Sequence, residues 1–395
     1  MIDLLLSHDG TPADDPGLIA ALAAHTERVL ASAHGADRFV LDRAETEVSA
    51  DPAGRIVWSP TGHATVHACG QSWAGGRFEV PTLAELRERA VVRAKGASPG
   101  APCRLWVLDG EGPATDIGAL QATAPDGVVF QVASQFNTLE ATGPRVVPVR
   151  RYPSDPTQGP RAAVSAFPGT LVRHYAAPAP DGTRLTQSTD GPQIELLGDV
   201  LPPSVARVDN GYLCTQGIAD DGAFAEALCA GFDQIRVGVH DGVEVVLGFN
   251  WDGAVEGPRR IAQVLTSTLA GGSYSDRSLS TGPLTTGCRQ LLRGAYLGTL
   301  LAAAALGHRA VVLTLIGGGV FANPPALLWE AILWAVQEVD HLAPCGLEVI
   351  VNGRTLSRML PADDILGVTR AHGGAVIVLG RASYGGPPPA PRIVR

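Results

Sequence analysis

The sequence has few charged side chains and no cluster of basic ones. Asp, Glu, Lys and Arg make up 17% of the 395 residues, and the formal net charge at pH 7 is -9. Nucleic acids and anionic membranes attract proteins through clustered Lys and Arg. We therefore expect neither a nucleic-acid nor a membrane partner. If the ligand carries phosphate groups, backbone N–H groups must do much of the holding.

Long apolar runs are also absent. The first ten residues, MIDLLLSHDG, contain no basic segment, and their apolar run is too short for a secretory signal peptide. The apolar run at 296–305 is too short to span a membrane and predicts a buried helix. The six cysteines are scattered without CxxC spacing, which predicts reduced thiols and a cytoplasmic location, although export by a specialised secretion system would leave the same pattern.

Common nucleotide and metal motifs are missing as well. The sequence contains no GxGxxG, no GK[ST] and no HExxH. His63 and His67 stand four residues apart, as two ligands on one helix face would, but Pro60 and Gly62 disfavour a helix there. We therefore expect no metal site and no cofactor.

What the sequence does contain is enough apolar material for a large core, with 45% hydrophobic residues and a mean hydropathy of +0.13. Its pattern changes near residue 100. Residues 1–100 are interpreted as an N-terminal accessory region, and residues 101–395 as the main domain. The segment KGASPGAP at 95–102 is typical of a linker between them.

The accessory region contains a predicted helix at about 18–33 and a predicted strand at 55–60. A second helix follows Thr82, because Thr82 and Glu85 have the spacing of a capping box before an amphipathic stretch.

From Cys103 onward, short apolar runs alternate with longer helical patterns. This alternation indicates a layered α/β fold, in which ligands bind at the ends of the strands. The run at 235–249 has a His-Asp-Gly turn between two Val-rich halves and predicts a hairpin. The predicted strands are 104–110, 127–134, 235–249, 310–317, 347–353 and 375–381, and the predicted helices are about 160–167, 222–230, 257–270, 286–306 and 325–339.

The most informative stretch is AVVLTLIGGGVFANPPALLWEAILWAV at 310–336. An apolar strand leads into Gly317, Gly318 and Gly319, and a helix with Pro325 near its first turn follows. Three glycines have no side chains that would block the backbone, so their N–H groups can converge on an anion. The partial positive charge at the N-terminus of the following helix favours the same anion. A tight strand-to-helix turn with packing glycines is the alternative interpretation.

Polar side chains follow an earlier strand, in GVVFQVASQFNTLE at 127–140. The strand ends in Gln135, Asn137 and Glu140, at the edge where sheet ligands bind, and Asp126 stands at its start. Asp126 could equally be an ordinary turn residue.

A third segment, YPSDPTQGPRAAVSAFPGTLVRHY at 152–175, carries Asp155, Gln158 and Gly159 before a helix rich in small residues. Asp155 is a candidate acid, or simply the residue that closes an Asx turn.

Taken together, these strings resemble the macrodomain family. The strand, the glycines, Val-Phe and the helix at 310–336 are similar to the second phosphate-binding loop of macrodomains, and 152–175 has the position of the first. The QFNTLE, YPSDPTQGP and LIGGGVF strings are most similar to the bacterial effector-type MavL-like group, which removes ADP-ribose from arginine. The resemblance covers about 105–380 in scattered blocks.

This resemblance implies a macrodomain-like three-layer α/β/α mixed sheet with insertions and an N-terminal accessory region. It implies that Asp126 contacts adenine and that Phe321 lines the pocket for the distal ribose. It implies binding of ADP-ribose and of an ADP-ribosylated protein. The residues that the resemblance places on the ligand are Asp126, Gln135, Asn137, Gln158, Gly159, Gly317, Gly318, Gly319, Val320, Phe321 and Asn323.

The chemistry expected of such a site is hydrolysis at the anomeric carbon of the ribose. Breaking this bond passes through an oxocarbenium-like state, which a carboxylate can stabilise while it orients or deprotonates water. Glu140 and Asp155 are the predicted catalytic residues. Two other functions stay open: a non-catalytic ADP-ribose-binding reader, and an unrelated α/β protein that uses the glycine loop for another nucleotide.

Overall fold

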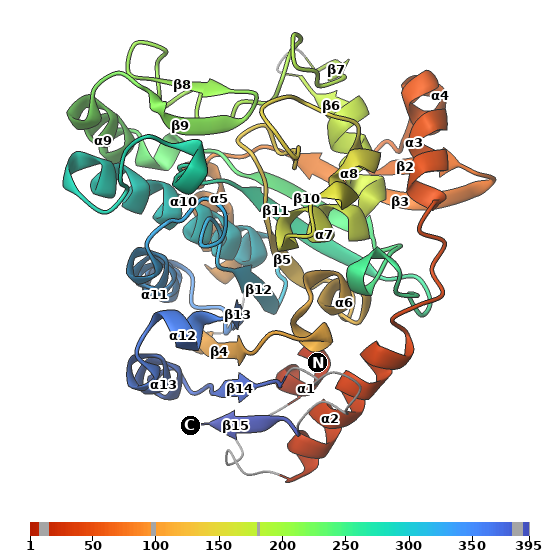
Figure 1. The fold of residues 1–395 in the computed structure, drawn as a ribbon, viewed down its shortest axis with the longest axis vertical. Coiled ribbons are helices and arrows are strands. Elements are labelled where there is room, and N and C mark those ends of the chain that lie inside the picture. The colour runs from red at the N-terminus through yellow and green to blue at the C-terminus, as the bar shows by residue number, and fades with distance from the viewer. Residues whose placement is uncertain (8–15, 96–99, 180–181, 381–389, 395) are drawn as a thin grey trace.

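The short β-branched runs of the sequence form one large mixed sheet. The computed structural model describes residues 1–7, 16–95, 100–179, 182–380 and 390–394. Within these residues the sheet runs from β1 at one edge to β15 at the other (Figure 1). Its order is β1 (Ile56–Trp58), β2 (Ala64–Ala68), β3 (Gln71–Glu79), β10 (Gly238–Glu244), β11 (Arg260–Thr266), β5 (Val129–Ala133), β12 (Ala310–Thr314), β13 (Glu348–Arg354), β4 (Arg104–Asp109), β14 (Val376–Val378) and β15 (Arg392–Val394).

The centre of the sheet is parallel and its edges are antiparallel. Strands β11, β5, β12, β13, β4 and β14 run in the same direction. The side chains of β12 from Ala310 to Leu313 are all buried, as parallel strands covered on both faces require. Because parallel strands end at one edge, the loops after β5, β12 and β13 meet there.

Helices cover both faces of this sheet, so the predicted three-layer α/β/α mixed sheet is confirmed. In Figure 1, α5, α10 and α11 lie on one side of the strands, and α6, α7 and α8 lie on the other. The helices are α1 (Ile2–Leu6), α2 (Pro16–Ala31), α3 (Val40–Ala50), α4 (Pro52–Arg55), α5 (Leu83–Lys95), α6 (Ile117–Ala122), α7 (Gln158–Ser165), α8 (Phe167–Tyr175), α9 (Asp221–Ala230), α10 (Gly282–Leu306), α11 (Pro325–Leu342), α12 (Leu356–Met359) and α13 (Ala362–Ala371).

Two sequence predictions of local structure are wrong. The segment 257–270, predicted as a helix, contains strand β11, whose residues after Arg260 are all buried. A short apolar run buried on both faces has no periodicity that separates strand from helix. The predicted hairpin at 235–249 contains instead the single strand β10. Gly242, with φ +73°, lies at an irregularity between His240 and Val243 and not in a reversing turn.

The N-terminal residues join the same sheet. Strand β3 pairs antiparallel with β10. The capping box of α5 is confirmed, because the Thr82 N–H donates to Glu85 Oε2 (2.8 Å) and the Glu85 N–H donates to Thr82 Oγ1 (3.1 Å). Residues 96–99 of the predicted linker lie outside the described residues, and the division of the chain near residue 100 stays a prediction.

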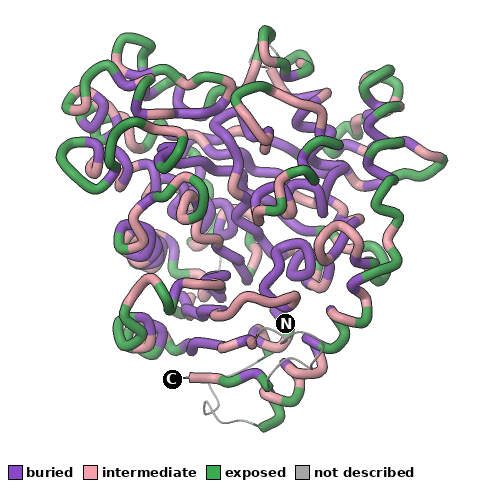
Figure 2. Tube along the Cα trace, in the orientation of Figure 1, coloured by how far each residue is buried: buried purple, intermediate pink, exposed green. Residues whose placement is uncertain are grey.

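A second, smaller core connects the N-terminal region to the rest of the protein. Leu41 and Val48 of α3 pack with Tyr152, Phe167 and other buried side chains. Figure 2 colours the buried stretches of the chain trace purple. The 3-10 helix η2 (Val149–Ser154) contributes residues to this core, and Asp155 follows it directly. The N-terminal region therefore supports the segment that contains a predicted catalytic residue.

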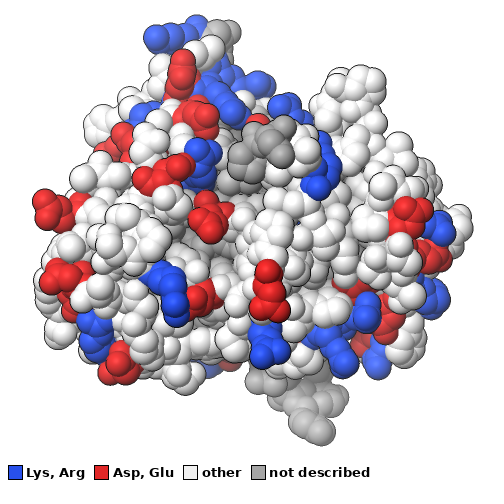
Figure 3. All heavy atoms as spheres, turned by 90° about the horizontal axis from the view of Figure 1, so that it is seen from above, with Lys and Arg blue, Asp and Glu red and all other residues white. Residues whose placement is uncertain are grey.

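One face of the protein carries charged side chains of both signs. Figure 3 shows acidic and basic side chains interspersed over one face, with large uncharged areas between them. Within the described part of the chain, no helix combines the length and the apolar character needed to cross a membrane.

Candidate functional site

A cavity of about 420 Å³ lies at the carboxyl ends of β5, β12 and β13, within the size range of small-molecule sites. Its walls come from segments far apart in the sequence. The lining residues are Glu111, Gln131, Ala133, Ser134, Gln135, Glu140, Ala141, Thr142, Asp155, Pro156, Thr157, Gln158, Gly159, Ala162, Tyr212, Thr268, Tyr274, Thr314, Leu315, Ile316, Gly317, Gly318, Gly319, Val320, Phe321, Asn352, Gly353, Arg354, Thr355 and Met359.

The glycine triplet forms one wall of this cavity. Gly317 has φ +73°, and a Cβ atom there would lie 2.7 Å from Asn323 Nδ2 and closer still to Thr268 Oγ1. Glycine is therefore required at 317 both by the backbone conformation and by the close approach. A Cβ atom on Gly319 would meet no atom within 4 Å, so this part of the loop faces open space.

Asn323 holds the glycine loop from behind. Its Nδ2 donates to the carbonyl oxygens of Leu269 (2.9 Å) and Gly317 (3.3 Å), and its Oδ1 accepts from Cys288 Sγ (3.1 Å). Asn323 is buried and is not among the cavity-lining residues. The structure therefore places Asn323 as a support of the loop, whereas Val320 and Phe321 line the cavity.

Glu140 and Asp155 line the same cavity as the glycine triplet. The Glu140 carboxyl group lies against Gly159 at the amino end of α7, because a Cβ atom at 159 would stand 2.9 Å from Glu140 Cδ. Burial raises the pKa of the Glu140 carboxyl well above its usual range, and the nearby Asp155 charge raises it further. The surroundings of Glu140 therefore favour the protonated form of its carboxyl group.

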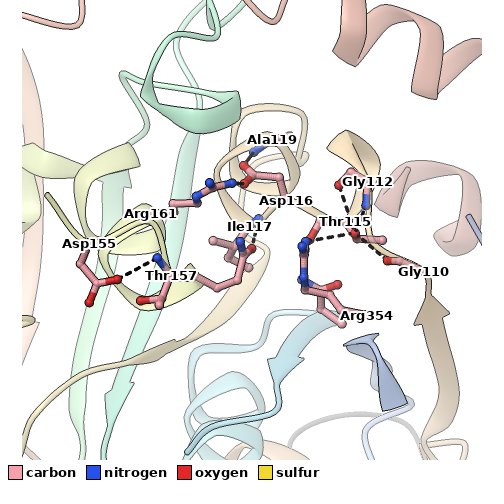
Figure 4. Close-up of polar contacts among 12 residues, drawn as sticks. Gly110, Gly112, Thr115, Asp116, Ile117, Ala119, Asp155, Thr157, Arg161 and Arg354 are labelled. Atoms are coloured by element: carbon pink, nitrogen blue, oxygen red, sulfur yellow. Dashed lines mark hydrogen bonds and ion pairs between the residues drawn. The ribbon is translucent and has the colours of Figure 1, made fainter. Parts of the chain in front are cut away.

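Asp155 makes the bond of an Asx turn and also lines the cavity. Its Oδ1 accepts from the Thr157 N–H (2.9 Å), which is the bond of an Asx turn (Figure 4). Among the described residues, no group donates a hydrogen bond to its Oδ2, and the residue lines the cavity. The turn therefore orients a carboxylate that still has an oxygen available to a ligand.

The amide side chains divide into cavity and support residues. Gln135 lines the cavity and clamps the following loop, since its Nε2 donates to the Ala141 carbonyl (3.0 Å) and its Oε1 accepts from the Ala141 N–H (2.8 Å). Asn137 is fully buried outside the cavity lining, where its Nδ2 donates to Gln193 Oε1 (2.9 Å) and its Oδ1 accepts from the Leu139 N–H (3.1 Å). Asn137 therefore shapes the loop that carries Glu140.

Gln158 and Gly159 both line the cavity at the start of α7. Gln158 Oε1 accepts from the Ile117 N–H (2.9 Å), which ties α7 to the first turn of α6. This bond fixes the two helix starts beside each other.

Asp126 lies away from the cavity. It is exposed at the amino end of β5, where its Oδ1 accepts from the Arg260 N–H (3.0 Å). The cavity lies at the opposite, carboxyl end of this strand. The structure therefore does not bring Asp126 together with the other predicted residues, because a residue before a parallel strand lies on the wrong edge of the sheet.

Sequence reasoning missed an aromatic wall of the cavity. Tyr212 and Tyr274 stack at 5.4 Å between ring centroids, and the Phe321 ring meets Tyr274 edge-on at 5.3 Å. Tyr212 begins β9 (Tyr212–Ile218), which pairs with β8 (Ala206–Asp209). The Asn-Gly turn at 210–211 signals such a hairpin, but nothing in the sequence predicts that its turn reaches the loop after β5, where the Phe136 N–H donates to the Gly211 carbonyl (2.8 Å).

The far end of the cavity was missed too. Asn352, Gly353 and Arg354 end β13 and line it beyond the glycine loop. The only sequence signal was their place after an apolar strand. Among the described residues, no group of three His, Cys, Asp or Glu side chains has the arrangement of a metal site.

Comparisons with known proteins find distant structural likenesses. No protein-family model and no curated protein matches the sequence. Among solved structures, poly(ADP-ribose) glycohydrolase from Deinococcus radiodurans in complex with ADP-ribose is similar, with a TM-score of 0.40, 14% identity and coverage of 73% of this chain and 95% of that chain. Poly(ADP-ribose) glycohydrolase from Thermomonospora curvata has a TM-score of 0.37, 16% identity and coverage of 80% and 92%.

Proposed function

We propose that this protein binds ADP-ribose and hydrolyses the bond that links it to a protein side chain. The observation that carries the proposal is that one cavity is lined by the glycine triplet at 317–319 and by two carboxyl side chains, Glu140 and Asp155. The Gly318 N–H donates to the Leu315 carbonyl (2.9 Å), whereas the N–H groups of Gly317, Gly319 and Val320 donate to no group among the described residues. These three N–H groups suit a diphosphate, and the acids suit chemistry on the sugar next to it.

The strand order supports this arrangement of the ligand. The loop after β5 carries Glu140, the glycine loop follows the neighbouring strand β12, and β13 lies next in the sheet. Neighbouring strands lie about 4.8 Å apart. A diphosphate at the glycine loop therefore places one half of ADP-ribose toward the acids and the other half toward β13.

The proposed reaction divides acid and base work between the two carboxyl groups. Glu140, whose protonated form is favoured by burial and by the Asp155 charge, donates a proton to the leaving nitrogen as the bond from that nitrogen to the anomeric carbon breaks. Asp155 accepts a proton from the water whose oxygen forms the new bond to this carbon. Exchange of protons with solvent then restores both groups.

The aromatic wall gives this site a boundary. Phe321, Tyr212 and Tyr274 form a contiguous cluster beside the acids. Such a wall shapes the pocket for a ribose ring and limits the entry of water other than the nucleophile. Gln135 and Gln158 complete the polar lining at this end.

We further propose that the leaving side chain is arginine. The proposal depends on the resemblance of the QFNTLE, YPSDPTQGP and LIGGGVF strings to the MavL-like macrodomains. We assign the site to residues 101–395 and a supporting role to residues 1–100, since α3 packs behind η2.

The test is release of free ADP-ribose from a protein modified on arginine. Wild type should release it, and Glu140→Ala and Asp155→Ala should slow the release by about 100-fold or more while changing ADP-ribose affinity far less. Asp126→Ala is the matched control, because Asp126 lies outside the cavity. Full turnover in both cavity variants would refute the catalytic assignment. Binding of ADP-ribose without release from arginine, glutamate or serine linkages would identify a reader.

A further inference from the structure

We propose that Arg354 binds the diphosphate of the ligand and is the positive charge that the glycine loop itself lacks. This inference deepens the proposed function and depends on it for the identity of the ligand. It starts from the composition of the cavity wall. Three of the lining side chains carry carboxyl groups, namely Glu111, Glu140 and Asp155, and among the described lining residues Arg354 alone is basic.

Arg354 is held in place by neutral groups. Its Nη1 donates to the Thr115 carbonyl (2.9 Å) and to Thr115 Oγ1 (3.1 Å), as Figure 4 shows. Asn352 Nδ2 donates to the same carbonyl (3.0 Å). These bonds fix the side chain without neutralising its charge.

The nearest acids are already occupied. The buried Asp116 carboxylate pairs with the Arg161 guanidinium and also accepts from the Ala119 N–H (3.1 Å) (Figure 4). The Glu111 carboxylate pairs with Arg358 at 3.3 Å. No ion pair to Arg354 occurs among the residues that the structure describes. The cluster of Arg161, Asp116 and Arg354 therefore carries one positive charge in excess.

Partial burial makes this unpaired charge costly. Removal from water lowers the pKa of the Arg354 guanidinium, although the charges of Asp116 and Glu111 oppose this effect. A partly desolvated cation is expected to have an anionic partner. An anionic ligand in the cavity would supply one.

The backbone at this position is strained in addition. Arg354 has φ +46°, in the left-handed region that a long side chain rarely adopts, and it follows an irregularity in the pairing of β13 with β4. Such strain is concentrated at ligand sites, where it aims a side chain. Here the strained residue is the last one of β13, beside the glycine loop.

Arg354 lies where it and the glycine loop can bind the same anion. Thr314 of β12 pairs with Asn352 of β13. Two residues farther along the chain from these partners lie Ile316, in the loop after β12 and directly before the glycine triplet, and Arg354, the last residue of β13. The N–H groups of the loop and the guanidinium of Arg354 thus reach one space from adjacent strands, and a guanidinium has the fork geometry that phosphate oxygens favour.

The experiment measures binding of ADP-ribose, inorganic pyrophosphate and adenosine by calorimetry or ligand-observed NMR. Arg354→Met should weaken ADP-ribose and pyrophosphate by about tenfold or more and leave adenosine unchanged. Arg354→Lys keeps the positive charge but lacks the forked guanidinium. Its affinities for ADP-ribose and pyrophosphate should lie between those of wild type and Arg354→Met. Asparagine tolerates the left-handed backbone conformation at 354. A loss of pyrophosphate affinity in Arg354→Asn as well would show that the loss in Arg354→Met does not come from misfolding. The charge-matched control is Arg370→Met, because Arg370 is exposed on α13.

Each outcome decides between the claims. Unchanged pyrophosphate affinity in both Arg354→Met and Arg354→Asn, or an equal loss of adenosine affinity, overturns the inference. A wild type that binds pyrophosphate through Arg354 but neither binds ADP-ribose nor releases it supports the inference and refutes the proposed function. A wild type that binds neither pyrophosphate nor ADP-ribose overturns both.

Discussion

Glu140 and Gly159 lie so close that position 159 admits no side chain: a Cβ atom there would stand 2.9 Å from Glu140 Cδ and closer to Oε1. Gly159→Ala should therefore displace the Glu140 carboxyl group and lower kcat by about tenfold or more, since small displacements of a catalytic group have large effects on rate. Single-turnover release of ADP-ribose measures this. Gly143→Ala is the matched control, because a Cβ atom at 143 meets nothing within 4 Å. Equal rates in the two variants would contradict the proposed role of Glu140.

The raised pKa of Glu140 predicts a dependence of stability on pH. A carboxyl whose folded-state pKa lies above its unfolded value, normally about 4.3, stabilises the fold below that unfolded value and loses this contribution as pH rises through the folded pKa. Glu140→Gln should therefore gain stability relative to wild type as pH rises, until the folded pKa is passed. The Asp155 charge is one cause of the raised Glu140 pKa. Asp155→Asn should therefore narrow the pH range over which the stability difference produced by Glu140→Gln changes.

Urea unfolding from pH 4 to pH 9 checks this prediction. A difference between wild type and Glu140→Gln that stays constant across the range would show that the Glu140 carboxyl titrates normally.

The buried Glu45 predicts a structural link between the N-terminal region and the catalytic segment. Its Oε1 accepts from the Val149 N–H (2.6 Å) and from Tyr175 Oη (2.8 Å), and its Oε2 accepts from the Arg150 N–H (2.8 Å). Glu45→Ala leaves the buried Val149 N–H and the two partly buried donors unpaired and should cost about 2–4 kcal/mol of stability. It should also lower kcat, because η2 leads directly to Asp155.

The control for Glu45 is Asp42→Ala, on the exposed face of the same helix. Denaturant midpoints and ADP-ribose release are measured on both variants. Wild-type release by a folded Glu45→Ala variant would show that η2 keeps its position without this carboxylate.

Asn323 predicts an effect on binding from outside the cavity. Asn323→Ala removes the bonds that hold the Gly317 carbonyl and the Leu269 carbonyl, so the glycine loop loses its preorganisation. We expect ADP-ribose affinity to fall by about tenfold with little change in the chemical step at saturation. Calorimetry and saturating single-turnover rates separate the two effects, and a lower rate at unchanged affinity would argue against a phosphate-binding loop.

Local patterns predicted much of the fold. The apolar runs that became β4, β5, β12, β13 and β14, and the capping box of α5, each carry their signal within a few residues. Segment 257–270 carries no such signal, because β11 is buried on both faces and its apolar run suits strand or helix alike.

The site divides in the same way. Glu140, Asp155 and the glycine triplet follow strands or precede a helix, where ligands gather, and the structure brings them to one cavity. Tyr212, Tyr274 and Arg354 could not be predicted, since their places depend on how a hairpin, a loop and a neighbouring strand pack in space. Asp126 was assigned by position in a resembling motif, but it lies at the amino end of β5.

The most direct test of this account is a crystal structure of Asp155→Ala with ADP-ribose bound. We predict that the diphosphate accepts hydrogen bonds from the backbone N–H groups of Gly317, Gly319 and Val320, which donate to no group among the described residues. We also predict that the anomeric carbon of the terminal ribose lies beside Glu140. Density for the ligand outside this cavity, or a ribose turned away from Glu140 with the loop unoccupied, would contradict the account.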